Sequence, residues 1–149
     1  MRADFRSMPM PSLKVIASAM ATRLAGVRVP TPSRVQENVL VMEYIGDETQ
    51  PAPLLRNVRL ENPQAVLNDL VVNLRAMRKA QLVHADLSEY NLLFWDGQVG
   101  VIDVGQSVPI DHPRAAEWFQ RDLANIAHYF HRLRVNVTSA SLEKAVLEG

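Results

Sequence analysis

Three polar side chains near the middle of the chain have a spacing that could serve phosphoryl transfer. Asp86 and Asn91 are five residues apart within residues 84–91, and Asp103 ends the apolar run 99–102. Phosphoryl transfer needs a carboxylate near the attacking oxygen and oxygen ligands for Mg²⁺. Asp86, Asn91 and Asp103 supply that set of groups.

Each of these residues also has a simpler explanation. Asp86 could cap a turn, and Asn91 could end the loop before a strand. A carboxylate at the end of an apolar strand costs free energy unless a cation or donors satisfy it, which favours metal ligation at Asp103. His84 is expected to be structural, bonding a backbone carbonyl. Asp122 shares the apolar face of a predicted helix, so we expect it to be a buried anchor that accepts backbone donors from the loop carrying Asp86.

Composition limits the function classes. A chain of 149 residues that is 48% hydrophobic fits one modest domain. Sixteen basic residues balance sixteen acidic ones, so no overall charge attracts nucleic acid or a membrane, and no direct sequence-specific nucleic-acid binding is predicted. There is no cysteine, and the four histidines lack zinc-ligand spacing. No apolar run approaches the roughly 20 residues of a membrane span, and no signal peptide is recognised, so a soluble, cytoplasmic protein is expected.

Turn signals predict the element that must position the polar residues. Asp96-Gly97 favours a two-residue hairpin turn between strands at 92–95 and 98–102. In that register Asn91 lies one rung from Asp103, but strict alternation points their side chains to opposite faces. The pairing must therefore loosen at this end if both bind one metal cluster.

The remaining elements follow from caps, prolines and apolar periodicity. We predict helices at 13–24, 63–80 and 113–132, a last short helix capped by Thr138 or Ser139, and paired strands at 34–36 and 39–42. Residues 47–60 are expected to form a linker. We place a partial small lobe at 1–46 and a large lobe, with the loop and hairpin, at 47–149.

Several segments, in order, resemble the RIO family of atypical serine/threonine protein kinases. They are Leu82–Leu93, Val101–Val108 and Asp111–Pro113, and the hinge-like Val39–Gly46 and Pro51–Leu55 look closest to the first RIO subfamily. The matching segments run from about Ala25 to Phe130. The resemblance implies an α+β, protein-kinase-like fold with a truncated N-lobe and a mainly helical C-lobe.

The resemblance also implies roles for the polar residues. Asp86 would be the catalytic aspartate that orients or deprotonates the nucleophile. Asn91 and Asp103 would hold Mg²⁺ against the ATP phosphates. Asp103 would also be catalytic in an ATPase cycle, by taking the phosphoryl group as an aspartyl-phosphate.

The implied cofactors are ATP and Mg²⁺. Backbone groups of Glu43 and Ile45 would bind the adenine edge, with Met42 behind it. The implied partners are a protein substrate or the chain itself, and pre-40S particles during maturation of the small ribosomal subunit.

The sequence departs from the kinase pattern upstream of the hinge. A kinase needs a glycine-containing phosphate loop there, and a lysine paired with a helix glutamate. Val15 falls where the glutamate is expected, and Lys14 is a poor substitute for the lysine. The expectation is a fragment, a misassigned gene start or a degenerate member. The alternative function is a catalytically impaired, kinase-like scaffold for pre-ribosomal partners, and a third option is a small-molecule phosphotransferase.

Overall fold

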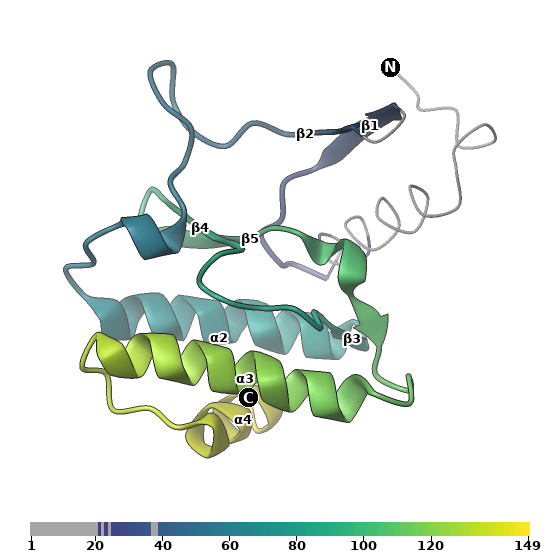
Figure 1. Ribbon diagram of the computed structural model, residues 1–149, viewed down its shortest axis with the longest axis vertical. Helices are drawn as coiled ribbons and strands as arrows, with labels where there is room; N and C mark the ends of the chain where they lie inside the picture. Colours follow the sequence, from purple (N-terminus) through teal and green to yellow (C-terminus); the bar gives the residue numbers. More distant parts are fainter. Residues whose placement is uncertain (1–20, 22, 24, 37–38) are drawn as a thin grey trace.

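The computed structural model describes residues 21, 23, 25–36 and 39–149. Two antiparallel strands, β1 (Pro32–Gln36) and β2 (Val39–Met42), lie at one end of the molecule. Three helices lie at the other end: α2 (Pro63–Lys79), α3 (Ala115–Arg132) and α4 (Ser139–Leu147). The hairpin of β4 (Leu92–Trp95) and β5 (Gln98–Val101) lies between the strand pair and the helices (Figure 1).

The predicted strand pair at the first end is confirmed. Gln36 pairs with Val39, and the turn at 37–38 lies outside the described residues. Most of the helix predicted at 13–24 also lies outside them, although Ala21 and Arg23 are helical. After the helix the chain turns at Ala25-Gly26, as expected.

The three large-lobe helices begin close to their predicted caps. The Asn62 side chain accepts a hydrogen bond from the Ala65 N–H at 3.1 Å, which caps α2. Thr138 and Ser141 form a capping box at the start of α4. Helix α3 starts at Ala115, two residues later than predicted, because residues 113 and 114 are still in a turn.

The apolar faces of these helices form the core. Helix α4 packs against both α2 and α3. The predicted core positions of the three helices are buried: Leu67, Leu70, Val71, Leu74, Met77, Phe119, Leu123, Ile126, Phe130, Leu142 and Val146. Among the described residues, no helix combines the length and apolarity needed to cross a bilayer.

The hairpin has the predicted register. Leu92 pairs with Val101 and Trp95 with Gln98. Both turn residues are left-handed, with φ of 52° at Asp96 and 74° at Gly97, as a two-residue turn that follows the twist of the strands requires.

Residues 47–60 are more structured than the predicted linker. Gly46 bridges to Pro51, and the Phe94 N–H of β4 donates to the Pro53 carbonyl at 3.1 Å. A 3-10 turn, η1 (Leu55–Asn57), buries Leu55 completely. The sequence also gave no signal for the short strands β3 (Leu82–Val83) and β6 (Val108–Pro109), which pair with each other. The lobe boundary between 46 and 47 stays a prediction.

Candidate active site

A pocket of about 320 Å³ brings together three of the residues singled out in the sequence. Asp86 and Asp103 line it, and Met42, at the end of β2, lies in its wall. Both aspartates are exposed, so their carboxylates can reach a bound molecule. The pocket therefore offers two carboxylates beside an apolar wall.

Asp103 reaches this pocket because β5 ends at Val101 and the hairpin pairing ends at Ile102. The Ile102 N–H still donates to the Asn91 carbonyl at 2.9 Å, as the last rung of the hairpin. Asp103 then takes a left-handed conformation, with φ 57° and ψ 46°, and a 3-10 turn, η2 (Val104–Gln106), follows. The alternation of side chains ends at Asp103, so the loosening that a shared site requires is present at this position.

The loop that carries Asp86 is anchored to α3 by Asp122. This carboxylate is 2% exposed, and it accepts the Ala85 N–H at 2.9 Å and the Leu87 N–H at 2.8 Å. Burial raises the pKa of Asp122, while the two backbone donors oppose that shift. The predicted anchor is confirmed.

His84 forms hydrogen bonds to both segments that carry the pocket aspartates, the Asp86 loop and the residue before Asp103. Its ring is 2% exposed, and Nε2 lies 3.1 Å from the Ile102 carbonyl, next to Asp103 in the chain. The Asp86 N–H donates to His84 Nδ1 at 3.2 Å. These partners assign the ring proton to Nε2, because Nδ1 must accept. The structural role predicted for His84 is confirmed.

Asn91 faces the loop rather than the pocket. Its Oδ1 accepts the Ser88 N–H at 2.9 Å, and its Nδ2 donates to the Asp86 carbonyl. The side chain is buried and is not among the residues that line the pocket. An amide oxygen has two lone pairs, so Oδ1 retains one for a metal. Metal ligation by Asn91 stays a prediction.

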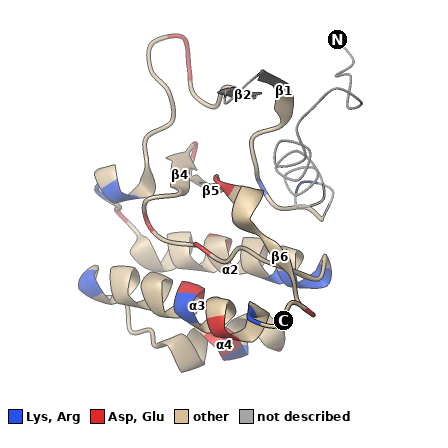
Figure 2. Ribbon diagram, turned by 45° about the vertical axis from the view of Figure 1, so that its right-hand side comes forward, with Lys and Arg blue, Asp and Glu red and all other residues tan. Residues whose placement is uncertain are grey.

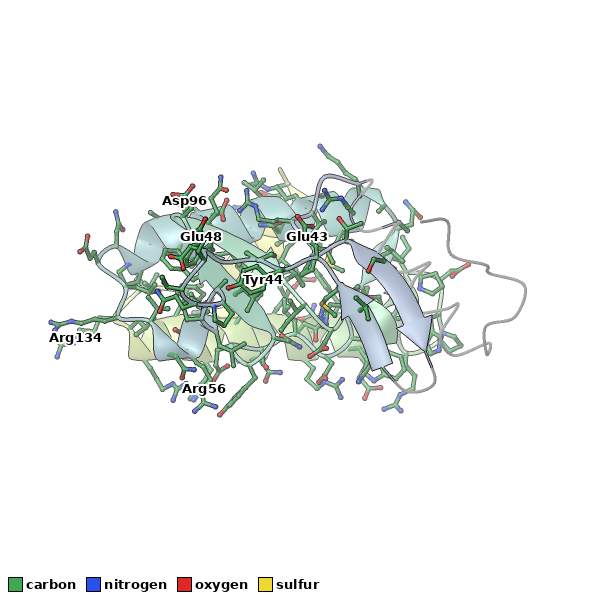
Figure 3. The ribbon with its side chains drawn as sticks, turned by 90° about the horizontal axis from the view of Figure 1, so that it is seen from above. Glu43, Tyr44, Glu48, Arg56, Asp96 and Arg134 are labelled. Atoms are coloured by element: carbon green, nitrogen blue, oxygen red, sulfur yellow. The ribbon has the colours of Figure 1, made fainter. Side chains whose placement is uncertain are left out.

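The segment after β2, which was predicted to be a hinge, leaves two backbone polar groups unpaired within the described residues. The Glu43 N–H donates to the Thr31 carbonyl, and the Ile45 carbonyl accepts the Ala52 N–H, both at 2.7 Å. The Glu43 carbonyl and the Ile45 N–H have no partner within the described part of the chain. Figure 3 shows Glu43 and Tyr44 on the segment that follows β2, above the body of the molecule. Neither Glu43 nor Ile45 lines the pocket, and adenine binding by them stays a prediction.

The Glu43 side chain holds this segment against the residues before β1. Its Oε2 accepts the Thr31 N–H at 3.1 Å and the Thr31 hydroxyl at 3.0 Å. These hydrogen bonds lower the pKa of Glu43. Ion pairing with Arg23 at 3.4 Å adds to the effect.

A family model of the RIO domain matches residues 13–144. The chain belongs to the RIO family. It is 44% identical, over 133 residues, to the RIO-type serine/threonine-protein kinase Rio1 of Haloferax volcanii, covering 89% of this chain and 46% of that protein. It is 41% identical to human serine/threonine-protein kinase RIO1 over 127 residues, covering 83% of this chain and 22% of that protein. The RIO chain described here thus spans half or less of the length of these two relatives.

Solved RIO structures share the fold. The Rio2 kinase–ADP/Mg²⁺–phosphoaspartate complex from Chaetomium thermophilum matches with a TM-score of 0.71 and 24% identity, over 98% of this chain and 51% of that one. Another structure of the same kinase matches with a TM-score of 0.69, over 95% of this chain and 49% of that one. The predicted α+β, kinase-like fold is confirmed.

Part of the pocket wall of this RIO chain was not predicted. Val29 and Pro30 contribute from the segment before β1, Pro32 from the start of β1, and Gly105 and Gln106 from η2. The Val101 N–H donates to the Arg28 carbonyl at 2.8 Å, which holds that segment against β5. The prolines indicated an extended segment, but nothing in the sequence indicated which strand it would meet.

The donor chemistry of the pocket fits Mg²⁺. The carboxylates of Asp86 and Asp103 are hard oxygen ligands, and a magnesium ion bound with nucleotide needs only one or two protein carboxylates. Within the described ranges, no three His, Cys, Asp or Glu side chains cluster as a complete metal site. The arrangement therefore suits an ion that arrives with phosphate groups better than a metal enclosed by protein.

Proposed function

We propose that this RIO chain is the core of an ATP-dependent serine/threonine protein kinase or ATPase. The supporting observation is that Asp86 and Asp103 line one pocket beside Met42, the residue expected behind the adenine. The Haloferax and human relatives are named serine/threonine-protein kinases, which supports the kinase activity. Charges of both signs are interspersed on the helices (Figure 2), so recognition of a substrate would be local.

The first proposed reaction is transfer to a serine or threonine. The hydroxyl oxygen attacks the γ-phosphorus, Asp86 accepts the hydroxyl proton, and ADP leaves as the bond to the β–γ bridging oxygen breaks. Asp103 and Asn91 would hold Mg²⁺, which when bound neutralises charge on the phosphate oxygens. The acceptor is a protein substrate or the chain itself.

The second proposed reaction is ATP hydrolysis through Asp103. A carboxylate oxygen of Asp103 attacks the γ-phosphorus, ADP leaves, and water then hydrolyses the aspartyl-phosphate to phosphate and the free carboxylate. The exposed position of Asp103 in the pocket supports this route. The Chaetomium Rio2 complex contains ADP, Mg²⁺ and a phosphoaspartate. We also propose a cytoplasmic role on pre-40S ribosomal particles.

Isosteric substitutions in the native full-length protein test the chemistry. Asp86→Asn and Asp103→Asn should each lower ATP turnover by about 10² or more, while Mg-ATP still binds. Asp111→Asn is the control, because Asp111 is exposed and does not line the pocket. Normal Mg-ATP binding with no turnover that depends on Asp86 and Asp103 would refute the proposal.

The rival function is a kinase-like scaffold. The observation in its favour is that Asn91, an expected metal ligand, is buried and does not line the pocket that holds Asp86 and Asp103. Thermal unfolding with and without Mg-ATP separates the two functions. A nucleotide-binding protein should gain about 2.7 kcal/mol at a nucleotide concentration of 100 times Kd. A protein that gains nothing would support the scaffold.

A further inference from the structure

Side chains alone satisfy the backbone around Asp86. In the described structure, none of the peptide N–H and C=O groups of residues 85–87 makes a backbone–backbone hydrogen bond. Asp122 accepts the N–H groups of Ala85 and Leu87, and His84 accepts that of Asp86. Asn91 binds the Asp86 carbonyl. The position of Asp86 therefore depends on side chains from other parts of the fold.

Two further α3 side chains hold the carbonyls on either side of Asp86. Arg121 Nη2 donates to the Ala85 carbonyl at 2.6 Å, and Asn125 Nδ2 donates to the Leu87 carbonyl at 3.2 Å. Arg121 and Asn125 are four residues apart, so they lie on the same face of the helix. Together with Asp122 they bind the N–H and the carbonyl of both Ala85 and Leu87, the residues on either side of Asp86.

The backbone at this point requires such support. Ala85 has φ of 73°, a left-handed conformation that L-residues other than Asn, Asp and His rarely adopt. Strained conformations of this kind persist where the surroundings over-determine them. Asp122 holds the N–H of Ala85, and Arg121 holds its carbonyl, so α3 fixes both sides of the strained residue.

We propose that Arg121 and Asn125 are positioning residues that fix the direction of the Asp86 carboxylate. The inference rests on the proposed function, because Asp86 must meet a hydroxyl at hydrogen-bond distance. Arg121 acts on the carbonyl before Asp86, and Asn125 on the carbonyl after it. The positive charge of Arg121 also helps Asp122 to remain a carboxylate, since it opposes the effect of burial on the pKa of Asp122.

The variants are chosen to change these bonds alone. Arg121→Ala removes the donor to Ala85, and Arg121→Lys keeps a cationic donor. Asn125→Asp keeps the size of the side chain but replaces the donor with an acceptor that faces the Leu87 carbonyl. Arg114→Ala is the matched control, because Arg114 lies just before α3 and is exposed, and its guanidinium binds Glu117 and lies over the Trp118 ring rather than binding the Asp86 loop.

Two measurements on the native full-length protein decide the proposal. In steady-state ATP turnover, Arg121→Ala and Asn125→Asp should lower kcat by about 10- to 100-fold, as expected for a small misplacement of a catalytic group. KM for ATP should stay within about twofold, and Arg121→Lys should recover part of the loss. In hydrogen–deuterium exchange, the amides of residues 85–87 should exchange faster in the two impaired variants, while those of α2 stay protected.

Each result has a clear reading. Unchanged exchange at residues 85–87 in Arg121→Ala and Asn125→Asp would overturn the positioning role, whatever the activity. A loss of kcat that only follows the fraction of unfolded protein would overturn it as well. A wild-type protein without turnover would refute the proposed function, while faster exchange in the variants would still support the anchoring of the loop by α3.

Discussion

Replacing Asp122 by alanine should destabilise the protein by about 2–6 kcal/mol. The substitution leaves the Ala85 and Leu87 N–H groups without the carboxylate that binds them at 2.9 and 2.8 Å. A buried donor left unsatisfied costs about 1–3 kcal/mol, and the 2% exposure of Asp122 leaves water little access to replace it. The expected loss is large beside the 5–15 kcal/mol or so of total stability typical of a domain.

Urea unfolding at neutral pH measures this loss. Asp111→Ala is the control, because Asp111 is exposed, and it should change the free energy of unfolding by no more than about 0.5 kcal/mol. Asp122→Asn keeps one acceptor oxygen, so its loss should be intermediate. A loss below about 1 kcal/mol for Asp122→Ala, with an unchanged m-value, would refute the reasoning that these bonds support the fold.

The pH dependence of the same site has a definite sign. Burial raises the pKa of Asp122, so the folded protein holds this proton more tightly than the unfolded chain does. The contribution of Asp122 to stability is therefore greatest below its unfolded pKa of about 3.9 and falls as the pH rises through the folded pKa. The stability of the wild type relative to Asp122→Asn should decrease over that interval. A difference that increases there would contradict the assigned shift.

Two further predictions concern the hinge and the hairpin. The pKa of Glu43 is lowered by its bonds to Thr31, so its stabilising effect should be present above its unfolded value of about 4.3 and be lost as the pH falls through the folded pKa. Glu43→Gln should therefore destabilise the protein at neutral pH and have no effect in acid, and a pH-independent difference in urea unfolding would contradict this. Gly97→Ala should cost about 1–2 kcal/mol, because φ is 74° but nothing lies within 4 Å of the added Cβ. Gly46→Ala should cost more, since its Cβ would lie 2.8 Å from Pro51 Cα, and equal losses in urea unfolding would refute this distinction.

Local signals account for the parts of the fold that the sequence predicts. Asp96-Gly97 determines its own turn and hence the register of β4 and β5. Asn62 and Thr138 cap α2 and α4 through bonds to residues three positions away. Each signal is complete within a few residues. The pairing of β3 with β6 lacks such a signal, because two-residue strands carry no periodicity and their contact depends on the packed helices.

The residues of the candidate site also fall into two groups: those that local sequence signals reveal and those that they do not. Asp86 and Asp103 could be found from their spacing, and Asp122 from its place on an apolar helix face. Arg121 and Asn125 could not, because each bonds a carbonyl 36 or 38 residues away in the chain. The pattern of an exposed polar residue on a helix is the same whether its side chain faces solvent or a loop. Only the packing of α3 against the Asp86 loop shows that the side chains of Arg121 and Asn125 face the loop rather than solvent.

The left-handed conformation of Asp103 explains how a regular hairpin can direct a carboxylate into the pocket. Continued pairing would carry the alternation past Val101 and turn the side chains of Asn91 and Asp103 to opposite faces. The pairing instead ends at Ile102, and the left-handed turn at Asp103 brings this carboxylate into the pocket with Asp86. Asn91 stays in the loop and donates to the Asp86 carbonyl. The hairpin therefore sets where Asp103 lies relative to Asn91, and the end of the pairing sets the direction of the Asp103 side chain. An aspartate suits this position, because it tolerates the left-handed conformation better than most residues and also supplies the carboxylate.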